Sequence, residues 1–350
     1  MIKESLISID LTHILEHTNP LWDELRGKRI FITGGTGFFG KWLLESFICA
    51  NYQLKLNAQM HVLSRDPEAF RMSYPHLADA NGIVFYRGDV RTFDFPKEQI
   101  EFIIHAATDA SAQLNRNNPL LIMDTIIEGT RRVLDFSLSC GAKRFLLISS
   151  GAVYGKQPVD LSHIPEDYQG APDPTQPASA YSEGKRLSEF LCSIYRKEHG
   201  IESVIARCFA FVGPYLNLNI HYAIGNFIRD GLAGKPIRVT GDGTPLRSYL
   251  YSADLAIWLW ALLFRGTPGE VYNVGSEQAI SIRDLACEVA AYFSNSPKVI
   301  ISKPPVPGKP AERYVPSTRK PRTELGLDMN IHLDEAVRRT VNWNQCLQDC

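Results

Sequence analysis

The sequence lacks the features that mark several large classes of protein. Its longest uninterrupted apolar run, at 255–264, is far shorter than the roughly 20 residues that a helix needs to cross a bilayer. The N-terminal segment mixes charged residues among apolar ones, which does not fit a signal peptide. The formal net charge is only −1, without the basic excess typical of nucleic-acid-binding proteins. These absences predict a cytoplasmic protein that binds neither membranes nor nucleic acid.

Cysteine and histidine form no recognisable framework. The seven cysteines are an odd number and include no C-x-x-C pair, which is typical of a reducing compartment. The nine histidines include no H-E-x-x-H motif, so we predict no metal site. What the chain does have is a hydrophobic fraction of 45% over 350 residues, enough to bury a large core.

Short apolar segments alternate with helical patterns over most of the chain. Because these segments are mostly apolar throughout, they fit parallel strands that helices cover on both faces. This alternation predicts an α/β fold, a Rossmann-type doubly wound parallel sheet. Strands are expected at 29–33, 59–64, 83–86, 101–105, 144–149 and 203–207, and helices at about 38–50, 120–140 and 181–199.

A glycine-rich turn directly follows the first expected strand. Its glycines fit G-x-G-x-x-G at 35–40 and G-x-x-G-x-x-G at 34–40. Between a strand and a helix, such glycines let the backbone approach a pyrophosphate, and the first N–H groups of the helix face the anion. The turn also reads G-x-x-x-x-G-K, but Trp42 stands where a P-loop needs Ser or Thr for Mg²⁺. We therefore predict a nicotinamide dinucleotide on Gly34, Gly35, Thr36, Gly37, Phe38, Phe39 and Gly40.

The end of the second strand indicates which dinucleotide binds. An NAD site usually presents an acidic side chain there to the ribose 2′-hydroxyl. Here the strand ends in Ser64-Arg65, with Asp66 following. A hydroxyl and a guanidinium suit a 2′-phosphate, so Ser64 and Arg65 predict NADP. NAD remains the alternative, because Asp66 can reach back to the ribose.

A tyrosine and a lysine stand four residues apart in YSEGK (181–185), which places them on one face of the expected helix. A phenol has a pKa near ~10 and needs a nearby cation to act at neutral pH. Lys185 supplies that charge to Tyr181. The strand at 144–149 leads into Ser150, and ligand sites of parallel sheets form at such strand ends. Ser150, Tyr181 and Lys185 are the predicted catalytic residues.

In these motifs the chain resembles the extended short-chain dehydrogenase/reductases, in particular the NAD(P)-dependent nucleotide-sugar epimerases, dehydratases and reductases. The resemblance extends from about residue 28 into the 340s. The motifs that carry it are TGGTGFFG (33–40), RGDV (87–90), HAAT (105–108), EGT (128–130), SSGAVYG (149–155), YSEGK (181–185), GDGTPLRSYLY (241–251), NVGS (273–276) and RTELG (322–326).

The resemblance implies roles for further residues and a partner. The implied substrate is a nucleotide-diphosphate sugar, and the implied assembly is a homodimer with its seam on the helices at 120–140 and 181–199. Residues implied to flank the adenine or line the cofactor groove are Asp89, Val90, His105, Ala106 and Ala107. Residues implied to contact the sugar nucleotide are Ser150, Asn226, Arg247 and Arg313.

Two positions narrow the reaction. Dehydratases of this family place Asp-Glu directly after the catalytic hydroxyl residue, and its decarboxylases use Glu at the second of these positions. Here the two residues are Gly151 and Ala152, which transfer no protons. We therefore predict a 4-keto-sugar reductase acting at C4, with a 4-epimerase that retains its cofactor as the alternative. A dehydratase or decarboxylase ranks third, and a non-catalytic dinucleotide-binding sensor ranks last because it would need neither Tyr181 nor Lys185.

The same motifs divide the chain. Residues 1–27 are predicted to form an N-terminal helical extension, with a break at Asn19-Pro20. Residues 28–206, with a return segment near 245–278, would form the NAD(P)-binding domain. Residues 207–244 and 279–345 would form a smaller, interleaved C-terminal lobe that binds the nucleotide sugar.

Overall fold

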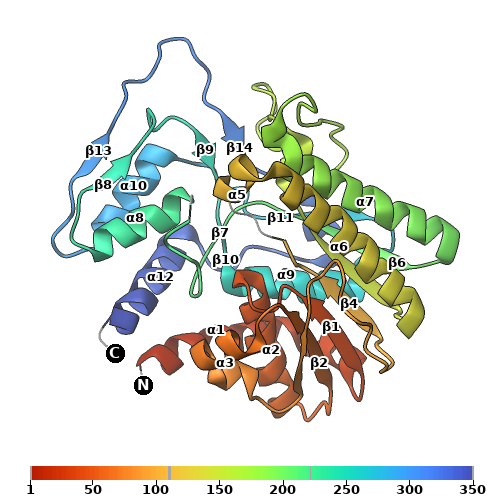
Figure 1. Ribbon diagram of the computed structural model, residues 1–350. Coiled ribbons are helices and arrows are strands. Elements are labelled where there is room, and N and C mark those ends of the chain that lie inside the picture. The colour runs from red at the N-terminus through yellow and green to blue at the C-terminus, as the bar shows by residue number, and fades with distance from the viewer. Residues whose placement is uncertain (1, 109–111, 221, 349–350) are drawn as a thin grey trace.

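A seven-stranded parallel sheet forms the centre of the molecule (Figure 1). The structure is a computed structural model that describes residues 2–108, 112–220 and 222–348. All neighbouring strands are parallel, so their carboxyl ends lie along one edge of the sheet. The strand order is β3 (Ile83–Arg87), β2 (Gln59–Ser64), β1 (Arg29–Thr33), β4 (Phe102–His105), β5 (Arg144–Ser150), β6 (Glu202–Cys208) and β11 (Val271–Val274). The order reverses direction between β1 and β4, where sheets of this kind bind ligands.

Helices cover both faces of this sheet. One face lies against α2 (Phe38–Gln53) and α9 (Ser252–Arg265), and the other against α6 (Pro119–Cys140) and α7 (Ala180–His199) (Figure 1). Strand β1 shows why both faces need cover. Ile30 and Ile32 belong to the core beneath α2 and α9, whereas Phe31 belongs to the core beneath α6. The apolar run 255–264 lies in α9 and is entirely buried.

The N-terminal extension packs onto the rest of the molecule as a helix. It consists of α1 (Ile2–Thr18) and the 3₁₀ helix η1 (Asn19–Leu25), so the predicted break falls at the start of the second element, whose second residue is proline. Helix α1 contacts α2, α9 and α12 (Leu333–Gln348). Trp22 is fully buried, and its ring centroid lies 4.6 Å from that of Trp260 in α9.

A smaller lobe is built from short elements (Figure 1). Its three-stranded sheet has the order β12 (Ile280–Ser281), β9 (Leu246–Arg247) and β14 (Arg313–Tyr314). Two further pairs are β13 (Val299–Ile301) with β8 (Ile237–Val239) and β10 (Leu250–Tyr251) with β7 (Phe211–Val212). The longer helices of this region are α8 (Ala223–Leu232) and α10 (Ile282–Ala291). Between these elements the chain returns to the large sheet as α9 and β11, so the two lobes are interleaved.

The remaining elements are short. They are α3 (Pro67–Ser73), α4 (Pro75–Ala78), α5 (Ala112–Asn117), α11 (Arg319–Leu325) and the 3₁₀ helices η2 (Gly151–Tyr154) and η3 (Pro177–Ser179). Among the described helices, none is long and apolar enough to cross a bilayer.

The predicted fold class is confirmed. Each expected strand and helix is present, with ends that differ by a few residues from the predicted ranges. Strand β11 was not among the expected strands, because Asn273 interrupts the apolar pattern of its four residues. The predicted domain limits stay predictions.

Candidate active site

The glycine-rich turn joins β1 to α2 at the point where the strand order reverses. Gly34 has a φ of +73°, in the left-handed region that favours glycine. A Cβ on Gly40 would come within 2.4 Å of the Gly34 carbonyl oxygen, so a larger residue would push α2 away from the turn. Gly37, which precedes α2, is exposed, and a Cβ there would meet only that same carbonyl oxygen, at 3.3 Å. The turn therefore presents accessible backbone at the start of α2, which fits a pyrophosphate.

The residues predicted for the far end of the dinucleotide lie after β2 and β3. Asp66 accepts a hydrogen bond from the Ala69 backbone N–H at 3.3 Å and so caps α3. Its carboxylate also lies 3.9 Å from Arg87. Arg65 is exposed, and its positive charge helps to lower the pKa of Asp89, although the hydrogen bonds from Arg91 are the larger cause. Arg65 and Asp89 thus both lie at the carboxyl ends of the neighbouring strands β2 and β3.

His105, at the end of β4, is a buried hydrogen-bonded residue. Its Nδ1 lies 2.8 Å from the Thr33 hydroxyl oxygen, and its Nε2 lies 3.1 Å from the Thr130 hydroxyl oxygen. Burial, together with a smaller effect of the Lys185 charge, lowers the pKa of His105 to about 3. Thr33 also accepts the Ala107 backbone N–H at 3.1 Å. The hydrogen bonds of His105 and Thr33 therefore fix the segment that follows β4. The His105 imidazole is uncharged at neutral pH.

The other predicted cofactor residues lie around this segment. A Cβ on Gly34 would lie 2.7 Å from the Ala106 carbonyl carbon and oxygen, so the two segments touch. Val90 is buried and packs against Gly129 of α6. Phe38 and Phe39 form the first turn of α2, and the Phe39 ring meets the Phe211 ring edge-on at a centroid distance of 4.9 Å.

The three predicted catalytic residues meet at the carboxyl edge of the sheet. Ser150 ends β5 and accepts the Ala152 backbone N–H at 3.2 Å, which caps the turn η2. Tyr181 lies in the first turn of α7, near enough for the Ser150 hydroxyl to lower the pKa of its phenol. The Lys185 ammonium donates to the Thr108 hydroxyl at 2.7 Å and to the Ile148 carbonyl at 2.8 Å. An ammonium has three hydrogens, so one remains for a ligand.

Burial shifts both titratable members of this group. Burial lowers the pKa of Lys185 to about 8, while Cys208 and Glu189 act in the opposite direction. Burial also raises the pKa of the Tyr181 phenol above its usual range, and the hydrogen bond from Ser150 offsets part of that rise. A protonated lysine and a protonated phenol are therefore the forms present at neutral pH, as an acid catalyst requires.

An ion pair between Glu189 and Arg207 lies next to Lys185. Glu189 lies one helical turn after Lys185, and its carboxylate receives the Arg207 guanidinium at 2.7 Å. The Ser149 hydroxyl donates to the same carboxylate at 2.5 Å. The Arg207 guanidinium also lies over the Tyr154 ring, 4.6 Å from its centroid. This cluster joins β5, β6 and α7 directly behind the site.

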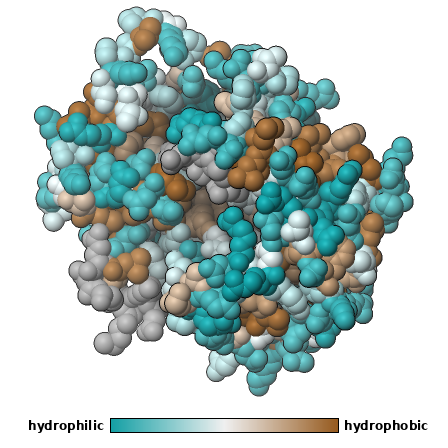
Figure 2. All heavy atoms as spheres, viewed as in Figure 1, coloured by the Kyte–Doolittle hydropathy of each residue, from teal (hydrophilic) through white to brown (hydrophobic). Residues whose placement is uncertain are grey.

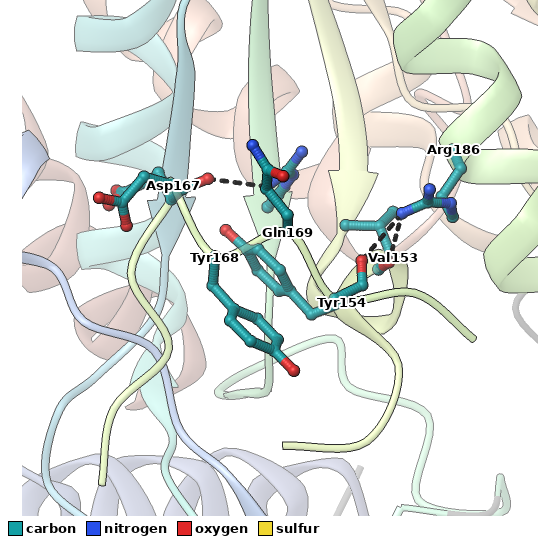
Figure 3. A pocket seen from close by; sticks show the side chains of 9 residues that line it. Val153, Tyr154, Asp167, Tyr168, Gln169 and Arg186 are labelled. Atoms are coloured by element: carbon teal, nitrogen blue, oxygen red, sulfur yellow. Dashed lines mark hydrogen bonds between the residues drawn. The ribbon is translucent and has the colours of Figure 1, made fainter. Parts of the chain in front are cut away.

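A pocket of about 500 Å³ lies beside this cluster (Figure 3). Arg186, labelled in the figure, donates to the carbonyls of Val153 at 3.2 Å and Gly170 at 3.0 Å. Arg207 is engaged by Glu189, so both arginines of this pocket already bind groups of the chain. The lining residues are Val153, Tyr154, Glu166, Asp167, Tyr168, Gln169, Gly170, Arg186 and Arg207. The Arg186 side chain therefore stabilises the turn after Ser150, and neither arginine offers an unpaired cation to a ligand in this pocket.

The predicted sugar-nucleotide residues come from the smaller lobe. Arg247 in β9 is half-buried and pairs in register with Tyr314 of β14, so their side chains share one face of the small sheet. Arg313 precedes Tyr314 and lies on the opposite face. Asn226, in α8, accepts a hydrogen bond from Arg229 at 3.0 Å. Arg247 is thus on the same face as a residue that reaches the catalytic group, and Arg313 is not.

Sequence reasoning missed three residues of this site. The Tyr314 hydroxyl oxygen lies 2.7 Å from where a Cβ on Gly151, the residue after Ser150, would stand, although no motif spacing links the two positions. Thr108, which binds the Lys185 ammonium, ends the HAAT segment and could have been included with it. Glu189 follows Lys185 by four residues on the same helix face, which is a readable signal for an electrostatic partner.

Comparisons with known proteins identify the family and the fold of the chain. A family model described as "NAD dependent epimerase/dehydratase family" matches residues 30–275. UDP-glucuronic acid decarboxylase 5 of Arabidopsis thaliana is 30% identical over 312 residues, covering 88% of this chain and 87% of the relative. The structure of a UDP-glucose 4-epimerase from Thermotoga maritima with UDP-glucose superposes with a TM-score of 0.78 at 21% identity, covering 91% of this chain and 99% of the other. A dTDP-glucose 4,6-dehydratase from Streptomyces venezuelae with NAD bound gives a TM-score of 0.77 at 22% identity, over 92% and 98% of the two chains.

Proposed function

The chain belongs to the NAD dependent epimerase/dehydratase family, and from this premise we propose that it is a 4-keto-sugar reductase acting on a nucleotide-diphosphate sugar. The observation that carries the proposal is the pair Gly151-Ala152 directly after Ser150. A site with Ser150, Tyr181 and Lys185 but no acid at these two positions has the groups for hydride transfer. It lacks a positioned carboxyl group for eliminating water or assisting decarboxylation.

The packing around Gly151 supports this exclusion for the first of the two positions. A Cβ at position 151 would lie 2.7 Å from the Tyr314 hydroxyl oxygen and 2.7 Å from a ring carbon of Phe209. The space that an acidic side chain would need is therefore filled by two aromatic residues. The Glu189 carboxylate is held by Ser149 and Arg207 and so is not free to take that role.

Each catalytic residue has a distinct task in the proposed reaction. When bound, the nicotinamide dinucleotide supplies the hydride that reduces the C4 carbonyl carbon. Tyr181 donates its phenol proton to the carbonyl oxygen as negative charge develops there. Lys185, charged below its pKa of about 8, favours the phenolate that remains. Ser150 holds the carbonyl oxygen in place.

We propose NADPH as the preferred reductant. Asp66, the acidic residue that could have bound a ribose 2′-hydroxyl, is used to cap α3. Arg65 is exposed beside Asp89, and among the described residues no hydrogen bond engages its guanidinium. A guanidinium in this position suits the 2′-phosphate that distinguishes NADPH from NADH. For the substrate, Arg247 is the proposed ligand of the diphosphate.

Purified protein with a defined keto sugar tests the proposal. The probes are dTDP-4-keto-6-deoxyglucose and UDP-4-keto-6-deoxyglucose, each with NADPH or NADH, followed by the loss of reduced-cofactor absorbance. We expect one reduced cofactor to be consumed for each sugar reduced, and Tyr181→Phe to abolish turnover. Interconversion of UDP-glucose and UDP-galactose by protein that retains oxidised cofactor would instead establish the epimerase alternative. Formation of UDP-xylose from UDP-glucuronic acid would refute the argument from positions 151 and 152.

A further inference from the structure

Two hydrogen bonds hold the Lys185 ammonium between strand β5 and the segment that follows β4. The ammonium lies 2.7 Å from the Thr108 hydroxyl oxygen and 2.8 Å from the Ile148 carbonyl oxygen. It is the donor in both bonds, because an ammonium carries three hydrogens and no lone pair. Lys185 itself is a buried residue of α7. Three elements that are far apart in the sequence therefore meet at one nitrogen atom.

The Thr108 hydroxyl is itself held in place. It donates its own hydrogen to the Ala107 carbonyl oxygen at 2.7 Å, which leaves its lone pairs for the ammonium. The backbone of this segment is bound to the end of β1. The Ala106 N–H donates to the Thr33 carbonyl oxygen at 3.2 Å, and the Ala107 N–H donates to the Thr33 hydroxyl oxygen at 3.1 Å. The sheet therefore sets the position of the acceptor that Thr108 offers.

The two acceptors determine how the lysine presents its charge. A lysine side chain has a flexible four-carbon stem, so an ammonium without fixed partners can take several positions. The three N–H bonds are arranged tetrahedrally, and two bonds to fixed acceptors therefore set both the position of the nitrogen and the direction of the third hydrogen. The Ile148 acceptor is a backbone carbonyl and is present with any side chain at that position. The Thr108 hydroxyl, by contrast, depends on the residue type.

We propose that Thr108 is a positioning residue of the catalytic centre, whose hydroxyl accepts one hydrogen of the Lys185 ammonium and thereby fixes the direction in which the lysine presents its third hydrogen. This inference rests on the proposed hydride-transfer function, in which the charge of Lys185 favours the phenolate left on Tyr181. Without the Thr108 hydroxyl, one ammonium hydrogen loses its acceptor in a buried place, and the stem can swing about the Ile148 contact.

The same hydrogen bond affects the ionisation of the lysine. A hydrogen bond accepted from a charged group stabilises the charged form, so loss of the Thr108 hydroxyl should lower the pKa of Lys185 below its value of about 8. The other titratable groups near the ammonium are Glu189 on α7, Cys208 on β6 and the neutral His105 on β4. These groups are the same before and after a change at position 108.

Thr108→Val removes the hydroxyl and keeps the branched shape of the side chain. With dTDP-4-keto-6-deoxyglucose and NADPH, we expect kcat to fall by about ten-fold, the worth of one hydrogen bond to a charged group, while KM for the sugar changes far less. The fall of kcat at high pH should begin at lower pH than in the unaltered protein, because Lys185 loses its proton sooner. Thr108→Ala, which removes the hydroxyl without branching at Cβ, should behave in the same way.

Two further variants separate the hydroxyl from the fold around it. Thr108→Ser keeps the hydroxyl and should restore most of kcat and the original pH profile. Thr340→Val is the matched control, since Thr340 is a buried threonine of α12 whose hydroxyl donates to the Ala336 carbonyl at 2.6 Å, and kcat should not change. A Thr108→Val protein with the kcat of the unaltered protein, or a Thr108→Ser protein as impaired as Thr108→Val, would overturn the inference and leave the reductase proposal standing.

A second measurement needs no sugar. In protein labelled with carbon-13 and nitrogen-15 at lysine, the side-chain resonance of Lys185, assigned with Lys185→Met, follows the ionisation of its ammonium. In Thr108→Val we expect the Lys185 titration curve to lie at lower pH than in the unaltered protein, and in Thr108→Ser we expect the original curve. If no keto sugar is reduced, the proposed function fails while this titration still decides whether Thr108 binds the ammonium. Coincident curves for Thr108→Val and the unaltered protein would overturn the inference.

Discussion

At the scale of single residues, Lys185 combines burial with a positive charge. It is 4% exposed, and burial lowers its pKa to about 8. Its two hydrogen bonds, to Thr108 and Ile148, and the nearby Glu189 carboxylate compensate only part of the lost hydration. The charge that we propose to assist Tyr181 is therefore held at some cost to the folded state.

Lys185→Met measures that cost and the catalytic role together. We expect kcat to fall by about 10²–10⁴-fold, because the phenol loses its cation. The unfolded chain, with a lysine pKa near ~10.4, binds more protons than the folded chain above pH 8, so the unfolding free energy of the unaltered protein rises with pH there. Between about pH 8 and pH 10, the unfolding free energy of the unaltered protein should therefore rise by roughly 1–2 kcal/mol more than that of Lys185→Met, as measured by urea unfolding. A constant difference between the two proteins across this range would contradict the lowered pKa.

Arg65→Ala tests the choice of cofactor. We expect its dissociation constant for NADPH to rise about ten-fold, because one exposed charge-assisted hydrogen bond is lost, while that for NADH stays nearly constant. Arg87→Ala is the control, since Arg87 is a similarly exposed arginine that pairs with Glu68. Fluorescence titration of the reduced cofactors measures both constants. Equal weakening of the two cofactors by Arg65→Ala would leave NADP unsupported.

Sequence reasoning reached those residues whose spacing is set by a local element. Tyr181 and Lys185 share a helix face, and Ser150 ends a strand, so their meeting follows from the order of elements in a parallel sheet. Tyr314 could not be found this way, because it lies more than a hundred residues beyond any of them on a two-residue strand. Arg247 and Tyr314 lie on one face of the small sheet, and Arg313 lies on the other. This arrangement depends on the register of that strand, which no sequence pattern determines.

At the scale of elements, helix α1 is fixed by a buried carboxylate. Asp10 is 1% exposed, accepts the Tyr251 hydroxyl at 2.6 Å and pairs with Arg339 of α12. Burial raises the pKa of Asp10, and these partners offset part of that rise. One side chain thus connects the extension to β10 and to the C-terminal helix.

Asp10→Ala should destabilise the protein by about 2–4 kcal/mol, because it leaves the Tyr251 hydroxyl without its acceptor and removes one partner of Arg339. Asp23→Ala is the control: it breaks an exposed ion pair with Arg26 and should cost less than about 0.5 kcal/mol. Urea unfolding measures both. An Asp10→Ala protein as stable as the control would show that α1 is not held through this carboxylate.

The elements themselves were predictable to different degrees. The strands and helices of the large sheet have long periodic patterns, and the break before Pro20 follows from the missing N–H of proline. The small lobe has strands of two or three residues, such as β9 and β14, whose positions depend on contacts with distant segments. The sequence therefore indicated that a second lobe exists without indicating its sheet.

At the scale of the whole molecule, charge is placed locally within a nearly neutral chain. The net charge is −1. Arg65 and Arg247 are nevertheless the two cations that we propose for the anionic groups of the ligands, the ribose phosphate and the sugar diphosphate. Binding of these anions then depends on a few placed groups and the backbone of the glycine turn, not on a positive field over the surface.

The outer surface of α6 and α7 carries several apolar side chains that would be exposed to water in a monomer. Figure 2 shows brown side chains gathered over this region. Exposed apolar residues on the two helices are Leu120, Leu121, Leu138, Leu187 and Phe190. Patches of this kind mark interfaces in many soluble proteins. We propose that two copies of the chain pair α6 and α7 into a four-helix seam, the homodimer that the family resemblance implied.

Phe190→Glu should convert this dimer to a monomer. Phe190 is 61% exposed on α7, and a carboxylate there would be buried against its counterpart on the second copy, which costs several kcal/mol per interface. Tyr52→Glu is the matched control, because Tyr52 is 85% exposed on α2, away from the seam, and the variant should stay dimeric. Sedimentation equilibrium measures the mass of each, with one chain at 39.3 kDa. A single-chain mass for the unaltered protein, or a dimer that survives Phe190→Glu, would place the interface elsewhere or remove it.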